Sequence, residues 1–134
     1  MPTKETAAAK KHVLVVEDDR VNAKVLSDFL GAHGFSTTVA VTGAEGVERF
    51  RAERPDLMLI DVLLPNKSGF EVCFDVKRSP EGKNTPVLLM SAIYQDVHHA
   101  EQYARLGLRA DGFLTKPFEL NVLLQRIRHL LGEA

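Results

Sequence analysis

The sequence predicts an α/β fold in which a parallel sheet of five strands lies between two layers of helices. Short apolar runs recur along the 134-residue chain, most of them without polar alternation, and such runs are typical of strands covered on both faces. Longer stretches with apolar residues at helical spacing separate them. Because crossovers between parallel strands are right-handed and pack back onto the sheet, this order predicts helices on both faces.

The first two strand–helix pairs occupy residues 13–54. The run Val-Leu-Val-Val at 13–16 predicts a buried strand. The helix expected at 21–33 places five apolar side chains on one face at helical spacing. A weaker apolar run at 36–41 predicts the second strand, and a helix at 44–54 follows it.

Three further pairs complete the predicted sheet, and each begins with an apolar run followed by a helical stretch. These pairs are 57–60 with 69–78, 87–90 with 97–106, and 112–115 with 119–131. Glycine and proline interrupt the pattern at the boundaries, as expected for turns. The third helix carries Cys73 at helical spacing from Phe70 and Phe74, which favours an inert thiol packed in the core.

Composition limits the classes of function. The chain has 17 basic and 18 acidic residues, a net charge of −1, 45% hydrophobic residues and 26% charged residues. These values argue against disorder and supply no reason to bind nucleic acid or an anionic membrane directly. With a single cysteine, an internal disulfide and a CxxC site are excluded, which fits a reducing compartment. We therefore expect a cytoplasmic protein.

The ends of the chain set the expected domain limits. Residues 1–11 carry charges around a short alanine run and lack the apolar core of a signal peptide, so we expect a flexible tail. No run approaches the length of a membrane span. One domain at 12–132 is expected, either standing alone or cut from a longer protein, since no output segment follows residue 131.

Polar side chains follow four of the five predicted strands. Ligands of open parallel sheets bind beyond the carboxyl ends of the strands, so these groups are expected at one shared edge. The run at 36–41 has no such group after it, which favours the outer edge of the sheet for that strand. The polar residues are Glu17, Asp18 and Asp19 after the first strand, Asp61 after the third, Ser91 after the fourth and Lys116 after the fifth.

The chemistry of these groups suggests phosphoryl transfer. Glu17, Asp18 and Asp61 would repel one another unless a cation lay among them, and partly hydrated oxygen ligands suit Mg²⁺. An aspartate beside such a metal can act as a nucleophile toward a phosphoryl group. Lys116 and the Ser91 hydroxyl would neutralise charge on the remaining oxygens. The pattern therefore predicts transfer of a phosphoryl group onto Asp61.

Several motifs, in order and at domain spacing, carry a resemblance to a known family. With them, residues 12–131 resemble the receiver domains of two-component response regulators, the family that includes the chemotaxis protein CheY. The motifs are Val-Val-Glu-Asp-Asp at 15–19, Pro-Asp-Leu-Met-Leu-Ile-Asp at 55–61 followed by Leu64, Pro65 and Gly69, Met-Ser-Ala at 90–92, and Gly-Phe-Leu-Thr-Lys-Pro-Phe at 112–118.

The resemblance implies a fold and a set of site residues. The fold is the flavodoxin-like (CheY-like) α/β/α sandwich, with five parallel strands in the order 2-1-3-4-5 and five helices. Asp61 is implied as the phospho-acceptor, Asp18 as a direct Mg²⁺ ligand and Glu17 as a ligand through water. The backbone carbonyl of Leu63 would complete the protein's share of the metal shell. The bond between Lys116 and Pro117 is expected to be cis.

The resemblance also implies a signalling switch rather than an enzyme. The Ser91 hydroxyl would bond the phosphoryl group while the Phe113 ring turns inward. The donor would be the phosphohistidine of a histidine kinase or of a histidine phosphotransfer protein. A downstream protein partner would bind the face formed by 97–106, 112–115 and 119–131. The chain is expected to be a monomer or a phosphorylation-dependent dimer.

Other interpretations of the same residues stay open. Asp18 or Asp19 would serve equally well as the cap of the following helix. A receiver-like interaction module that works without phosphorylation is the main alternative, although it would not need Asp61, Ser91 and Lys116 together. A Mg²⁺-dependent phosphatase with an aspartate nucleophile is disfavoured, because a second acid is expected two positions on and Leu63 stands there. Ser68, where the family usually has Asp, is expected to alter loop capping more than chemistry.

Overall fold

The computed structural model describes residues 10–91 and 109–133 and contains one five-stranded parallel sheet in the order β2-β1-β3-β4-β5. This order is the 2-1-3-4-5 arrangement that the family resemblance implies. The strands are β1 (His12–Val16), β2 (Ser36–Ala40), β3 (Leu57–Asp61), β4 (Val87–Ser91) and β5 (Gly112–Thr115). The helices of the described residues are α2 (Arg20–Ala32), α3 (Gly43–Glu53), α4 (Gly69–Arg78) and α6 (Leu120–Leu130).

The predicted elements agree with this structure to within a few residues. β2 lies at the outer edge of the sheet, as expected for the run at 36–41. β3 and β4 extend one residue beyond the predicted runs, so Asp61 and Ser91 are the last residues of their strands. Four of the five predicted helices are described, and the one expected at 97–106 lies outside the described residues.

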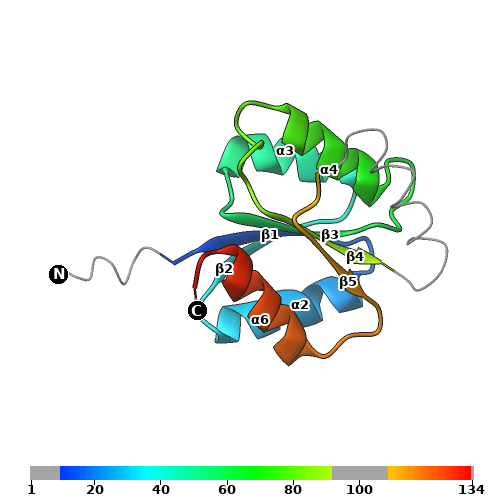
Figure 1. Cartoon of the computed structure of the whole chain (residues 1–134). Coiled ribbons are helices and arrows are strands. Elements are labelled where there is room, and N and C mark those ends of the chain that lie inside the picture. Colours follow the sequence, from blue (N-terminus) through cyan, green and yellow to red (C-terminus); the bar gives the residue numbers. More distant parts are fainter. Residues whose placement is uncertain (1–9, 92–108, 134) are drawn as a thin grey trace.

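Helices cover both faces of the sheet, α2 and α6 on one side and α3 and α4 on the other (Figure 1). Alternate strand residues therefore enter two separate cores: Val13 and Val15 pack with the α2 and α6 side chains, whereas Leu14 and Val16 pack with those of α3 and α4. All four are fully buried. Burying an aliphatic side chain of this size stabilises the fold by roughly 1.5–3 kcal/mol, which explains why these runs lack polar alternation.

Cys73 belongs to the α3–α4 core and is fully buried. Burial raises the pKa of its thiol to about 12, so the thiolate that reacts with oxidants and metals is disfavoured. The predicted packing of this thiol in the core is confirmed. None of the helices within residues 10–91 and 109–133 has both the length and the apolar character needed to cross a bilayer.

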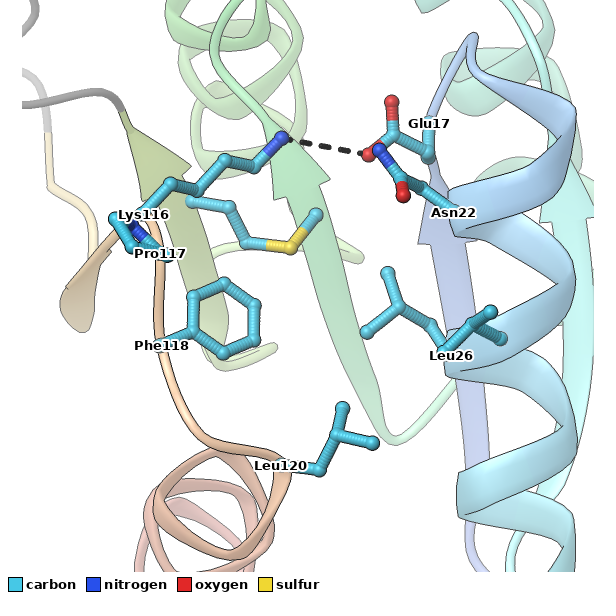
Figure 2. A pocket seen from close by; sticks show the side chains of 9 residues that line it. Glu17, Asn22, Leu26, Lys116, Pro117, Phe118 and Leu120 are labelled. Carbon is cyan, nitrogen blue, oxygen red and sulfur yellow. Dashed lines mark hydrogen bonds and ion pairs between the residues drawn. The ribbon is translucent and has the colours of Figure 1, made fainter.

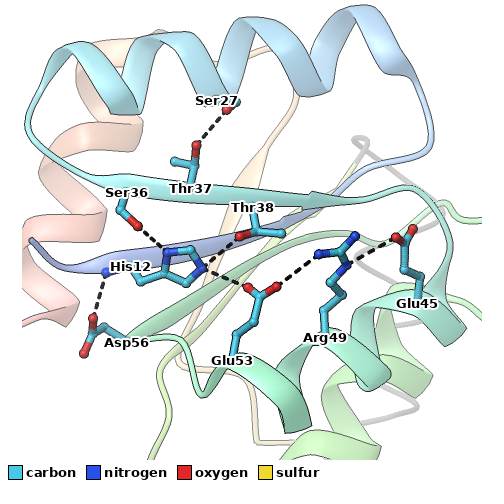
Figure 3. Close-up of polar contacts among 9 residues, drawn as sticks. All are labelled: His12, Ser27, Ser36, Thr37, Thr38, Glu45, Arg49, Glu53 and Asp56. Carbon is cyan, nitrogen blue, oxygen red and sulfur yellow. Dashed lines mark hydrogen bonds and ion pairs between the residues drawn. The ribbon is translucent and has the colours of Figure 1, made fainter.

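The edge strand β2 is fastened to its neighbours by a polar network centred on His12 (Figure 3). The His12 ring contacts the Ser36 hydroxyl through Nδ1, and its Nε2 lies 3.0 Å from both Thr38 Oγ1 and Glu53 Oε1. The backbone N–H of His12 donates to Asp56 Oδ2 at 2.7 Å. One side chain thus links β1, β2 and α3 at the amino ends of the strands, and so compensates for the open edge of the sheet.

The segment between β3 and α4 turns back tightly over the end of β3. The N–H of Gly69 donates to the carbonyl of Val62 at 2.9 Å, and a Cβ at Gly69 would lie 2.3 Å from the carbonyl oxygen of Asp61. Ser68 caps α4 in a capping box with Glu71, in which each side chain accepts a backbone N–H of the other residue. The start of α4 is therefore held directly against the strand end that carries Asp61.

Candidate functional site

The end of β1 supplies three consecutive acidic residues, and they have different surroundings. Glu17 is only 2% exposed, and its N–H donates to the carbonyl of Ala40 at 3.0 Å. Asp19 caps α2, because its Oδ1 accepts from the N–H groups of Val21 at 2.9 Å and Asn22 at 3.1 Å. Of the two residues that would serve as the cap, Asp19 does so.

Asp18 instead lies beside Glu17 and Asp61. Each of the three residues offers one carboxylate oxygen, and these oxygens lie within 4.8 Å of one another. Asp61 is 6% exposed, and its Oδ1 accepts the N–H of Leu63 at 3.1 Å. The ends of β1 and β3, which are adjacent strands, thus offer three hard oxygen donors. Glu17 and Asp61 are buried and Asp18 is exposed. Such a set of donors fits a divalent cation such as Mg²⁺.

Lys116 reaches the same group from β5. Its Nζ lies 3.0 Å from Asp61 Oδ2 and 3.5 Å from Glu17 Oε1. The backbone fixes its position, because the N–H of Lys116 donates to the carbonyl of Ser91 at 2.7 Å. The Lys116–Pro117 peptide bond is cis, as the family resemblance implied. One ammonium thus faces the carboxylates that end β1 and β3.

The electrostatics of the site follow from burial and like charge. Burial and the neighbouring carboxylate of Asp61 raise the pKa of Glu17 from 4.5 to about 7. Burial would lower the pKa of Lys116, but the hydrogen bond and charge of Asp61, together with Glu17, outweigh it and raise that pKa. The site thus holds an excess of negative charge that Lys116 only partly offsets.

The remaining predicted site residues occupy different positions. Leu63 is 71% exposed and, with Glu17, Asp18, Asp61 and Lys116, lines an open crevice of about 490 Å³. Ser91 is 2% exposed and ends β4, the strand next to β3. Ser91 is not among the described residues that line that crevice.

Phe113 is also absent from the described lining of the crevice. It lies in β5 with its side chain 39% exposed, and its carbonyl accepts from Arg126 Nη1 at 3.1 Å. The structure therefore brings Glu17, Asp18, Asp61, Leu63 and Lys116 together, whereas Ser91 and Phe113 are not among the described residues that line the crevice.

A largely apolar cavity of about 460 Å³ adjoins the crevice, between α2 and the segment that follows β5 (Figure 2). Glu17 and Lys116 lie at its polar end, and Leu26, Phe118 and Leu120 belong to its apolar wall. Asn22 lines both this cavity and the crevice. Asn22 was not predicted from the sequence. The only sequence feature that could have indicated Asn22 is that it is a polar residue one helical turn after Asp18. This position places it on the side of α2 that faces the site.

The fold and this site define a doubly wound α/β protein with an acidic crevice at the carboxyl edge of its sheet and a lysine facing the carboxylates. Residues 13–128 match the response regulator receiver domain family. The chain belongs to that family, and the fold is the CheY-like fold that the sequence motifs implied.

Individual relatives agree with this assignment. The chain is 39% identical over 126 residues to the transcriptional regulatory protein CseB of Streptomyces coelicolor. The aligned residues cover 92% of this chain and 50% of CseB. It therefore spans about half the length of that relative. The signal receiver domain of a signal transduction histidine kinase from Syntrophus aciditrophicus superimposes with a TM-score of 0.82 at 31% identity, covering 91% of this chain and 90% of that one.

A third relative matches in fold. The receiver domain of a sensor histidine kinase from Pseudomonas aeruginosa PAO1 superimposes with a TM-score of 0.80 at 23% identity, covering 93% of this chain and all of that one. That structure is described with a magnesium ion coordinated in its active site cleft.

Proposed function

We propose that this receiver domain accepts a phosphoryl group on Asp61 from the phosphohistidine of a histidine kinase or of a histidine phosphotransfer protein. The observation that carries the proposal is the position of Asp61, buried at a strand end, 3.0 Å from the Lys116 ammonium and grouped with two further carboxylates. An ordinary surface aspartate has no need of such surroundings, whereas a nucleophile toward a dianionic group does.

The transfer itself is a substitution at phosphorus. A carboxylate oxygen of Asp61 attacks, a P–O bond forms, and the P–N bond to the donor imidazole breaks. The electron pair of that bond stays on the imidazole nitrogen, which takes up a proton. Lys116 would shift from pairing with Asp61 to pairing with a phosphoryl oxygen, and so offset the charge that develops there.

The metal assigned to this site is Mg²⁺. Asp18 and Asp61 would hold it directly, Glu17 through water, and the backbone carbonyl of Leu63 would add a fourth protein contribution. The three grouped carboxylates and the magnesium described in the Pseudomonas aeruginosa relative support this assignment. When bound, Mg²⁺ supplies positive charge that reduces repulsion between the carboxylates and the incoming phosphoryl oxygens.

Phosphorylation would change the surface of the domain. Ser91 is buried at the end of β4, beside β3, from which its hydroxyl would bond the phosphoryl group, and the exposed Phe113 ring would turn inward. The face formed by β5 and α6 would then bind a downstream protein partner or a second copy of the chain. The stretch at 97–106, which the sequence-based prediction adds to this face, lies outside the described residues. In this proposal the domain at 12–132 acts as a cytoplasmic signalling switch that takes part in its own phosphorylation.

Intact-mass spectrometry after incubation with a small phosphodonor and Mg²⁺ tests the proposal. We expect one alkali-labile phosphoryl adduct, which Asp61→Asn abolishes and the matched variant Asp19→Asn retains. Absence of an adduct from the wild-type chain would favour the phosphorylation-independent interaction module instead. Continuous consumption of the donor without a lasting adduct would favour the phosphatase.

A further inference from the structure

A second concave site lies at the amino edge of the sheet, away from Asp61. α4, which is ten residues long, begins beside Asp61 and ends at Arg78, so its two ends are about 14 Å apart. Around the far end of α4 the surface forms a pocket of about 440 Å³. Its lining residues are Phe74, Lys77, Arg78, Ser79, Pro80, Lys83 and Arg109. The proposed phosphorylation uses none of them.

Positive charge dominates this pocket. Lys77 is neutralised, because its Nζ lies 2.7 Å from Asp111 Oδ2 and donates to the carbonyl of Thr85 at 2.6 Å. Arg78, Lys83 and Arg109 are exposed. None of them forms an ion pair with a carboxylate in residues 10–91 and 109–133. Three basic groups therefore face one concavity without a counter-charge from the described residues.

The three groups come from three different segments. Arg78 lies in the last turn of α4, where a cation also offsets the helix dipole. That role does not explain Lys83, which belongs to the following loop, or Arg109, which precedes β5. The tertiary fold therefore brings these cations together, beyond what the end of one helix requires.

Hydrogen bonds hold the loop that carries Lys83. The hydroxyl of Ser79 donates to the carbonyl of Val76 at 2.7 Å and accepts the N–H of Gly82 at 3.0 Å. The N–H of Lys83 in turn donates to the carbonyl of Ser79 at 3.1 Å. Gly82 is buried, and a Cβ there would lie 2.2 Å from the carbonyl oxygen of Val76. The loop backbone is thereby held against the end of α4.

The two arginines are also positioned by their neighbours. The guanidinium of Arg78 lies over the Phe74 ring, 5.1 Å from its centroid. Asp111, two residues after Arg109, accepts both the ammonium of Lys77 and the N–H of Val87, the latter at 2.8 Å. Such support lowers the entropy lost when the cations engage a ligand.

We propose that this pocket binds a small anion that carries two or more phosphate groups, such as diphosphate or a nucleoside diphosphate. Three cations that have no carboxylate partner within residues 10–91 and 109–133 match the charge of such an anion, and arginine forks fit phosphate oxygens in bidentate fashion. A volume of about 440 Å³ suits a small ligand rather than a macromolecule. Phe74 and Pro80 add an apolar rim against which a nucleoside would lie.

Calorimetric titration of the full chain with diphosphate, ADP and citrate, without Mg²⁺, tests the proposal. The variant R78Q/K83Q/R109Q removes the three cations. The matched variant R20Q/K24Q/R128Q removes three cations from α2 and α6, on the other face of the sheet. We expect diphosphate affinity to fall at least about tenfold in the first variant, since each lost charge-assisted hydrogen bond suffices for that factor. The second variant should bind like the wild type.

Amide chemical shifts locate the ligand. Shifts at Phe74, Ser79 and Lys83 support the proposal, whereas shifts confined to the surroundings of Asp61 overturn it. Equal loss of affinity in both variants also overturns it, because bulk charge would then explain binding. Citrate binding as tightly as diphosphate would overturn the phosphate assignment. If ADP binds more tightly than diphosphate, the pocket recognises a nucleotide. If the two bind equally, the pocket recognises the phosphate groups alone. Both results support binding of an anion with two or more phosphate groups. A urea unfolding transition of R78Q/K83Q/R109Q like that of the wild type shows that this variant is folded, whether or not Asp61 accepts a phosphoryl group.

Discussion

The Nζ atom of Lys116 lies 3.0 Å from Oδ2 of Asp61, although 55 residues separate them in the chain. The lysine side chain is 32% exposed and that of Asp61 is 8% exposed. Glu17, still more deeply buried, is the second carboxylate that the same ammonium contacts. In the absence of metal, Lys116 is therefore the main counter-charge of a buried acidic group.

Replacement of Lys116 by methionine is expected to destabilise the metal-free protein by about 2 kcal/mol, because two buried carboxylates lose their counter-charge. Lys67→Met is a matched control, since Lys67 is also 32% exposed but pairs with Asp75, which is 30% exposed. Loss of such a pair costs about 0–1 kcal/mol. Urea unfolding of both variants measures the difference, and equal destabilisation would contradict the role given to Lys116.

Mg²⁺ is expected to stabilise the fold through the carboxylates of Glu17, Asp18 and Asp61. At about ten times its Kd the stabilisation would be about 1.4 kcal/mol. Asp18→Asn should reduce this response strongly. Asp19→Asn should keep it, because Asp19 caps α2 and asparagine caps a helix equally well. Thermal unfolding with and without Mg²⁺ measures both responses, and an equal loss in the two variants would argue against a site at Asp18.

Glu53 is expected to make the stability of the protein depend on pH, independently of the acidic crevice. Burial alone would raise the pKa of Glu53, but hydrogen bonds from His12, Thr38 and Arg49 outweigh it and lower the pKa below 4.5. A carboxylate whose pKa is lower in the folded than in the unfolded state stabilises the protein at pH values above the unfolded-state pKa. This stabilisation is lost as the pH falls through the folded-state pKa.

Glu53→Gln should therefore destabilise the protein by about 1 kcal/mol near neutral pH, and the difference should shrink as pH falls below 4.5. Glu48→Gln, an exposed position on the same helix, is the control and should change stability little. Urea unfolding across this pH range measures both. A Glu53 effect that is constant with pH would contradict the ionic role of this side chain.

Gly69→Ala is expected to destabilise the protein by about 1–3 kcal/mol, because the new methyl group meets backbone atoms that have no room to move. It would lie 2.3 Å from the carbonyl oxygen of Asp61 and 2.7 Å from Cα of Val62. The same displacement should slow phosphorylation at Asp61.

Gly31→Ala provides the opposite control. Gly31 lies in α2, and no neighbouring atom lies within 4 Å of the position that a methyl group would take there, so alanine should stabilise the helix by up to about 1 kcal/mol. Denaturation midpoints and the rate of adduct formation separate the two glycines. A Gly69→Ala variant as stable and as reactive as the wild type would show that the β3–α4 turn is looser than the structure indicates.

The elements of the fold were predictable because the signals that specify them are local. Uninterrupted apolar runs identified the strands that are buried on both faces, and the weaker run at 36–41 identified the edge strand β2. The acidic residues and Lys116 were expected at one edge, because the carboxyl ends of parallel strands share an edge. That expectation needed only the order of the strands and the residue after each of them.

Tertiary structure decided which side chains meet, because contacts between distant segments have no periodic signature. It assigned the helix cap to Asp19, placed Lys116 3.0 Å from Asp61, and brought Asn22 to the rim of the crevice. The network around His12 and the cationic pocket of Arg78, Lys83 and Arg109 likewise join segments that sequence spacing leaves unrelated. By itself the sequence determined, to within one residue, which polar side chains stand at the ends of the strands. Packing of the helices against the sheet determined the distances between these side chains.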